Sequence, residues 1–191
     1  MTNRISASVS ESLKLKQEFF ASHSDDVERA ASMIAGSLSS DHKLLIFGNG
    51  GSAADAQHIA GELVNRFLQQ RRGLPAIALT TDGGVLTCIA NDVGFEKVFA
   101  RQVEALGNEG DVCLAISTSG QSANVIAGCE QARSQGIKVI GLLGCDGGKV
   151  APLCDIALIV PSNDTQRIQE THNLLGHILC ELIESAVFPT E

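Results

Sequence analysis

Five short apolar segments recur along the chain, and most are followed by a turn and then by a stretch with helical periodicity. Uninterrupted apolar strands that alternate with helices are typical of a parallel sheet covered on both faces. We therefore expect an α/β fold, with a doubly wound five-stranded parallel sheet flanked by helices. The expected strands are residues 43–47, 75–80, 111–116, 138–143 and 155–160.

The N-terminal region has the spacing of amphipathic helices. Residues 4–22 and 25–39 predict two helices, with Ser24 as the candidate N-cap of the second. Asp25 and Asp26 follow in its first turn, where carboxylates interact favourably with the helix dipole.

A long helix is also predicted near the C-terminus, over residues 165–187. No internal repeat or linker divides the 191 residues. We expect a single domain over residues 1–191, in which residues 1–40 form a helical N-terminal extension.

Charge and composition exclude several classes of protein. The formal net charge is −8 with only 14 Lys plus Arg, and no basic cluster exceeds Arg71–Arg72, so we expect no nucleic-acid partner. No apolar run reaches the ~18–20 residues of a membrane span. The N-terminal sequence does not resemble a signal peptide, and the six cysteines form no CxxC motif. We expect reduced cysteines in a cytoplasmic protein without a membrane partner.

A glycine-rich loop follows the first expected strand and opens directly onto a helix, with the sequence Gly48-Asn49-Gly50-Gly51-Ser52. Its backbone N–H groups and the helix N-terminus favour an anion. Such turns also occur for geometric reasons alone. The loop matches neither the Walker A nor the GxGxxG pattern, which disfavours a nucleoside triphosphate or a dinucleotide.

A hydroxyl-rich loop follows the third expected strand and also leads into a helix. Ser117, Thr118, Ser119 and Ser122 surround Gly120 in this loop. One hydroxyl is enough for an ordinary N-cap, whereas four predict a phosphate-binding loop that needs no lysine.

His58 and Glu62 are four residues apart on the helix after the glycine-rich loop, so both lie on one helix face. This spacing suits a shared divalent metal, and it equally suits a simple His–Glu pair on a surface. The pair is ~9–15 Å along the helix axis from the expected phosphate site, about the length of an extended sugar phosphate.

The C-terminal helix contributes Gln169, Glu170, His172 and His177. Gln169 and His177 are eight residues apart, which places them ~12 Å apart along a straight helix and ~80° out of phase. They cannot easily reach one metal. Either only one of them binds it, or the helix is broken, or neighbouring chains share the site.

These motifs together resemble a single sugar isomerase (SIS) domain, in the residues 48–53, 117–120 and 167–172. More narrowly, the chain resembles the phosphoheptose isomerases, also called sedoheptulose-7-phosphate isomerases, over nearly its whole length, including residues 89–92. The most specific part of the resemblance is the set His58, Glu62, Gln169 and His177.

The resemblance implies a homotetramer that binds zinc and interconverts sedoheptulose 7-phosphate with glycero-manno-heptose 7-phosphate, the start of heptose synthesis for the lipopolysaccharide core. It implies that Glu62 and His177 form the acid–base pair and that the active site lies between subunits. It implies His58, Glu62, Gln169 and His177 as zinc ligands. The implied substrate contacts are Asn49, Gly50, Gly51, Glu62, Asn91, Asp92, Ser117, Thr118, Ser119, Ser122 and Gln169.

A non-catalytic relative with the same domain, which binds the bacterial replication initiator protein, is the alternative. That relative lacks counterparts of Glu62 and His177, and this chain has both. Isomerisation moves a proton between C1 and C2 of the sugar, which requires a base over the carbon and an acid near the oxygens. The sequence leaves open whether Glu62 is a metal ligand, the base or both.

Overall fold

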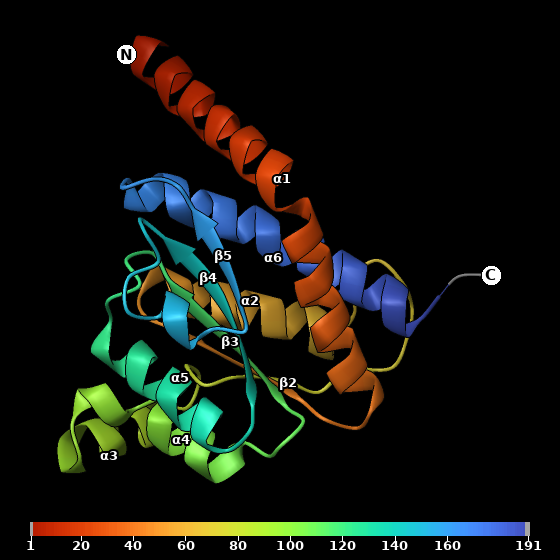
Figure 1. Cartoon of the computed structure of the whole chain (residues 1–191), viewed down its shortest axis with the longest axis vertical. Helices are drawn as coiled ribbons and strands as arrows, with labels where there is room; N and C mark the ends of the chain where they lie inside the picture. Colours follow the sequence, from red (N-terminus) through yellow and green to blue (C-terminus); the bar gives the residue numbers. More distant parts are fainter. Residues whose placement is uncertain (1, 190–191) are drawn as a thin grey trace.

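The computed structural model describes residues 2–189; residues 1, 190 and 191 of the expected domain lie outside the described residues. Five parallel strands form one sheet in the order β2-β1-β3-β4-β5, with helices on both faces (Figure 1). The expected fold class and all five expected strands are confirmed, with ends that differ by no more than two residues. The strands are β1 (Leu44–Gly48), β2 (Ala76–Ala78), β3 (Val112–Ser117), β4 (Lys138–Gly144) and β5 (Ile156–Val160).

Six α-helices and two short 3-10 helices occur among residues 2–189. None of these helices is long and apolar enough to cross a membrane. The α-helices are α1 (Thr2–Ser39), α2 (Gly51–Val64), α3 (Gly83–Asp92), α4 (Ala100–Leu106), α5 (Ala123–Ser134) and α6 (Thr165–Val187), and the 3-10 helices are η1 (Phe95–Lys97) and η2 (Ala151–Leu153).

Alternation along the strands divides the core into two layers. Leu44 and Ile46 of β1 pack in the layer under α1, α2 and α6, whereas Leu45 and Phe47 pack in the layer with α4 and α5. Because successive side chains of a strand point to opposite faces, fully apolar strands supply both layers. All five residues of β1 are buried.

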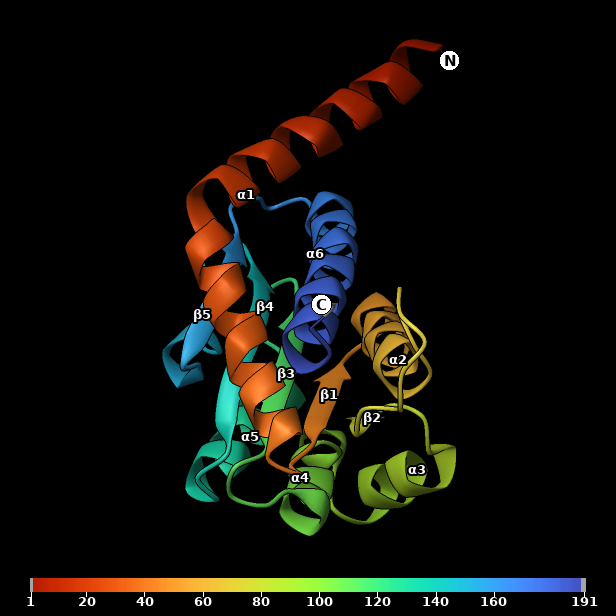
Figure 2. The same ribbon diagram turned by 90° about the vertical axis from the view of Figure 1, so that its right-hand side faces the viewer.

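The predicted break between two N-terminal helices is wrong, because α1 is continuous. Ser24 does not cap a helix: its hydroxyl donates to the Phe20 carbonyl at 2.6 Å, and that of Ser22 donates to the Glu18 carbonyl at 3.0 Å. Hydroxyls that bond back to the preceding turn bend helices without ending them. Figure 2 shows α1 changing direction about midway, with its N-terminal part projecting from the rest of the chain.

The predicted C-terminal helix is confirmed as α6, which begins after the N-cap Asp164. The Asp164 carboxylate accepts from the backbone N–H of Gln166 at 2.9 Å and of Arg167 at 3.3 Å. An aspartate at this position satisfies N–H groups that have no partner within the helix.

The strand order has a switch point between β1 and β3, because the chain moves from β1 to β2 on one side and returns to β3 on the other. Ligands of open α/β sheets bind at such a point, beyond the carboxyl ends of the strands. The loop after β1 leads into α2 on one face, and the loop after β3 leads into α5 on the other. The fold therefore brings together the two loops that the sequence indicates for anion binding.

Candidate functional site

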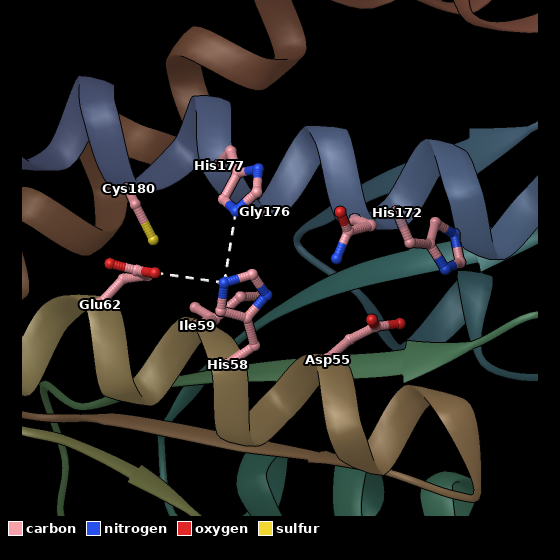
Figure 3. Close-up of a pocket in the computed structure, with 9 residues that line it drawn as sticks. Asp55, His58, Ile59, Glu62, His172, Gly176, His177 and Cys180 are labelled. Atoms are coloured by element: carbon pink, nitrogen blue, oxygen red, sulfur yellow. Dashed lines mark hydrogen bonds and ion pairs between the residues drawn. The ribbon is translucent and has the colours of Figure 1, made fainter. Parts of the chain in front are cut away.

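Two imidazoles and one carboxylate converge between α2 and α6. His58 Nε2 lies 3.2 Å from Glu62 Oε1 on the same helix and 3.3 Å from His177 Nε2 on α6. One possible ligand atom from each of the three residues lies within 4.8 Å of the others. Figure 3 shows His177 pointing from α6 toward the α2 pair. We call His58, Glu62 and His177 the His–Glu–His cluster.

A close approach of the two helices makes this convergence possible. Gly176 precedes His177, and a Cβ atom there would lie 3.1 Å from the side chain of Ile59. Ile59 follows His58 and packs in the same core layer as Leu175 and Leu179. The apolar contact thus fixes the spacing of the helices beside the two histidines.

The His–Glu–His cluster remains accessible. The His58 side chain is 40% exposed and that of Glu62 is 28% exposed. A pocket adjoins the cluster on the inner side of both helices, and it is lined by Asp55, His58, Ile59, Glu62, His172, Asn173, Gly176, His177 and Cys180.

Gln169, the fourth residue of the specific set, lies apart from the other three. Its Nε2 donates to Asp55 Oδ2 at 3.4 Å, and its amide group packs against Gly51, where any side chain would collide with it. Because α6 is continuous between residues 165 and 187, a break in the helix cannot bring Gln169 and His177 to one metal. Within one chain, Gln169 faces the start of α2 and His177 faces its middle.

Asp55 lies on α2 one turn before His58 and was not among the residues indicated by the sequence. Burial raises the pKa of Asp55, while hydrogen bonds from Gln169 and Asn173 and the nearby His58 act in the opposite direction. The spacing of Asp55 and His58, three residues on one helix, is the signal that could have identified it.

The glycine-rich loop after β1 is fixed by a pair of amides. Asn49 and Asn124 exchange two side-chain hydrogen bonds of 2.8 Å, and Asn124, on α5, is buried. This pair joins the loops after β1 and β3 across the switch point. Asn124 had no sequence signal of its own, because its partner is 75 residues away.

The hydroxyl-rich loop has both structural and free groups. The buried Ser117 Oγ accepts from the Gly120 N–H at 3.1 Å, and the exposed Ser119 Oγ accepts from the Gln121 N–H at 3.2 Å. Ser122 stands at the N-cap of α5, yet no hydrogen bond from its side chain caps this helix in the described part of the chain. The Ser122 hydroxyl is therefore not used to cap α5 among the described residues.

Asn91 and Asp92 lie exposed at the end of α3, where Asn91 Nδ2 donates to Asp92 Oδ1 at 2.7 Å. Neither side chain hydrogen-bonds to the loops after β1 and β3 within residues 2–189.

His172 is fully buried, and its Nε2 lies 2.9 Å from the Leu143 carbonyl. A carbonyl only accepts, so Nε2 carries the proton and donates. Burial lowers the pKa of His172 to about 4, against the opposing effect of this hydrogen bond. His172 is therefore a neutral structural residue near neutral pH.

The chain is similar to known proteins over most of its length. The family model of the SIS domain matches residues 9–144. A phosphoheptose isomerase from Aquifex aeolicus is 51% identical over 187 residues, covering 98% of each chain. One from Thermodesulfovibrio yellowstonii is 52% identical over 186 residues, covering 97% of this chain and 92% of the relative.

Solved structures extend the similarity to three dimensions. The phosphoheptose isomerase of Neisseria gonorrhoeae superposes with a TM-score of 0.92 at 46% identity, and that of Francisella tularensis with 0.93 at 39% identity. Each comparison covers 96% of this chain and 98% of the solved chain. The chain therefore belongs to the phosphoheptose isomerases, a family of SIS-domain enzymes that act on sugar phosphates.

Proposed function

We propose that this enzyme interconverts D-sedoheptulose 7-phosphate and D-glycero-D-manno-heptose 7-phosphate, and that it thereby begins heptose synthesis for the lipopolysaccharide core. The observation that carries the proposal is the convergence of Glu62 and His177 beside His58, between α2 and α6. The related enzymes are named phosphoheptose isomerases, which supports a heptose phosphate as the substrate.

Glu62 and His177 carry the proton transfers in this proposal. Ketose–aldose isomerisation removes a proton from one of the carbons C1 and C2 and returns it to the other, while a second group moves a proton between the oxygens. Glu62 acts at the carbon, and His177 acts at the oxygens, because imidazole donates and accepts protons near neutral pH. Glu62 and His177 come from two different helices, α2 and α6, and both line the same pocket.

The phosphate binds at the two loops of the switch point. We assign its contacts to Ser117, Thr118, Ser119 and Ser122, at the start of α5. Helix N-termini with nearby hydroxyls bind phosphate without a lysine. The remaining proposed substrate contacts are Asn49, Gly50 and Gly51 in the glycine-rich loop, Asn91 and Asp92 on α3, and Gln169 on α6.

A zinc ion fits the donor set of the His–Glu–His cluster. Two imidazole nitrogens and one carboxylate oxygen within 4.8 Å match the three protein ligands of a catalytic zinc site. We propose His58, Glu62 and His177 as ligands, with Gln169 as the fourth. When bound, zinc supplies a Lewis acid that polarises the sugar carbonyl.

We propose a homotetramer whose active sites are shared between subunits. Gln169 faces the start of α2 in its own chain, so a site that uses both Gln169 and His177 is most easily completed by a neighbouring chain. The projecting part of α1 offers apolar surface for assembly: Ile5, Val9 and Leu13 are each more than half exposed and lie four residues apart. The compartment is the cytoplasm, in keeping with six free cysteines.

Turnover of sedoheptulose 7-phosphate by the purified protein, before and after zinc removal, tests the proposal. We expect turnover, together with about one zinc per chain that is lost in His58→Ala. Inactivity with and without zinc would contradict the isomerase. Inactivity combined with tight binding to the replication initiator protein would instead favour the adaptor.

A further inference from the structure

The irregular segment between α2 and β2, residues 65–75, is held in place by Glu184 and Arg71. We call this buried pair the Glu184–Arg71 anchor. The Glu184 carboxylate of α6 accepts three consecutive backbone N–H groups of this segment and the Nε–H of Arg71. The donor–acceptor distances are 3.0 Å from Phe67, 2.7 Å from Leu68, 2.8 Å from Gln69 and 2.7 Å from Arg71. The side chains of Arg71 and Glu184 are 2% and 1% exposed, so the pair is buried.

Arg71 joins the anchor to the end of α2. Its Nη2 donates to the Glu62 carbonyl at 3.0 Å, and its Nη1 donates to the Leu63 carbonyl at 2.8 Å. These carbonyls lie in the last turn of α2, where no further turn of helix supplies partners. The anchor therefore restrains the backbone of Glu62 as well as the segment that follows.

Phe67 connects the anchored segment to the His–Glu–His cluster. Its ring stacks on the imidazole of His177, with centroids 5.8 Å apart and an interplanar angle of 24°. The same imidazole forms a T-shaped pair with that of His58, with centroids 4.8 Å apart and an interplanar angle of 88°. His177 and Glu184 both lie on α6, seven residues apart, so α6 holds in place the segment that packs against its own histidine.

A buried ion pair is by itself weak support for a purely stabilising role, because desolvation offsets much of its attraction. Here the Glu184 carboxylate also accepts from the backbone N–H groups of three successive residues, and these hydrogen bonds fix one conformation of the segment. Proton transfer is sensitive to such placement, since a shift of about 1 Å can cost about 10²-fold in rate.

We propose that Glu184 and Arg71 are positioning residues for the isomerisation: they hold Phe67 against His177 and fix the end of α2 that carries Glu62. The inference rests on the proposed function of Glu62 and His177, and it adds three residues, Glu184, Arg71 and Phe67, that are not among the proposed substrate contacts or metal ligands.

Phe67→Leu tests the inference without breaking the buried pair. We expect kcat to fall roughly tenfold with KM changed less than about twofold, because the imidazole loses its support while the phosphate contacts remain. Phe67→Tyr retains the ring and should restore most of the kcat. Phe20→Leu is the matched control, because Phe20 is another partly buried phenylalanine of the same core layer and lies on α1.

A zinc titration of the metal-free proteins gives a second readout that does not depend on turnover. Phe67→Leu should weaken zinc binding about tenfold by misplacing His177, whereas Phe20→Leu should not. Unchanged kcat and zinc affinity in Phe67→Leu, or equal losses in Phe20→Leu, would overturn the inference and leave the isomerase intact. An inactive wild-type protein would overturn the proposed function, and the zinc titration would still decide whether Phe67 positions His177. A wild-type protein that lacks both turnover and zinc binding would overturn both.

Discussion

The His–Glu–His cluster and the Glu184–Arg71 anchor lie close together along α2 and α6. Each contains one glutamate, but the two carboxylates differ in exposure and in the number of hydrogen bonds that they accept. The Glu62 side chain is 28% exposed, and its single hydrogen-bond partner among the described residues is His58. The Glu184 side chain is 1% exposed and accepts from four donors. Glu62 retains capacity for a ligand or a proton, whereas Glu184 has none.

Glu62 is thus available for chemistry, whereas Glu184 has a structural role. Burial acts to raise the pKa of Glu184, but three backbone N–H groups and the Arg71 side chain outweigh burial, and this pKa lies below its ordinary value. A carboxylate held ionised in this way cannot take up a proton from a substrate near neutral pH. This difference supports the proposal that Glu62, and not Glu184, carries the proton transfer.

Of the two carboxylates, the buried Glu184 should contribute far more to the free energy of unfolding than Glu62. Glu184→Gln should lower the free energy of unfolding by about 3–5 kcal/mol, because it leaves Arg71 without its charge partner. Glu62→Gln should change it by less than about 1 kcal/mol. Urea unfolding at neutral pH measures both changes, and equal losses in the two variants would show that Glu184 is no more important to stability than Glu62.

The Glu184–Arg71 anchor should also make the free energy of unfolding depend on pH in the acid range. The folded pKa of Glu184 lies below its ordinary value of 4.5, so its stabilisation is complete above the unfolded pKa and is lost as the pH falls through the folded pKa. Glu184→Gln should remove this part of the pH dependence.

The buried His172 should also make the stability of the protein depend on pH. Its folded pKa of about 4 lies below the ordinary 6.5, so between these values the unfolded chain binds one proton more. The free energy of unfolding should fall by up to about 3 kcal/mol between pH 6.5 and pH 4, and His172→Gln should abolish that slope. His23→Gln, on α1, is the control. An unaltered slope in His172→Gln would show that His172 is not buried in its neutral form.

Replacement of Ser119 should have the smallest effect, and it should change only the affinity for the sugar phosphate. Ser119→Ala should weaken sugar-phosphate binding by about 0.5–1.5 kcal/mol, or up to about 3 kcal/mol if the hydrogen bond is charge-assisted. Isothermal titration with a sugar phosphate measures the change, and Ser134→Ala, at the other end of α5, is the matched control. Reduced zinc content with unchanged affinity would contradict a phosphate-binding role.

Local signals in the sequence account for much of this molecule. The five strands were predictable because each is a continuous apolar run, and His58 and Glu62 because four residues make one helical turn. The break before Ser24 was predicted wrongly, because a serine that caps a helix and one that bends it look alike in sequence. Arg71 and Glu184 are 113 residues apart, so no local pattern could reveal their pairing. For the same reason, Phe67 gave no sign of its contact with His177.

Exchange of the substrate's C1 and C2 protons with deuterated solvent tests most directly whether proton transfer takes place at Glu62. The wild-type protein should incorporate deuterium from solvent into sedoheptulose 7-phosphate. Glu62→Gln keeps the shape of the side chain and removes the base, so exchange should fall by ~10²-fold or more while the substrate still binds. Near-normal exchange in Glu62→Gln, with binding intact, would contradict the assignment of Glu62 as the base.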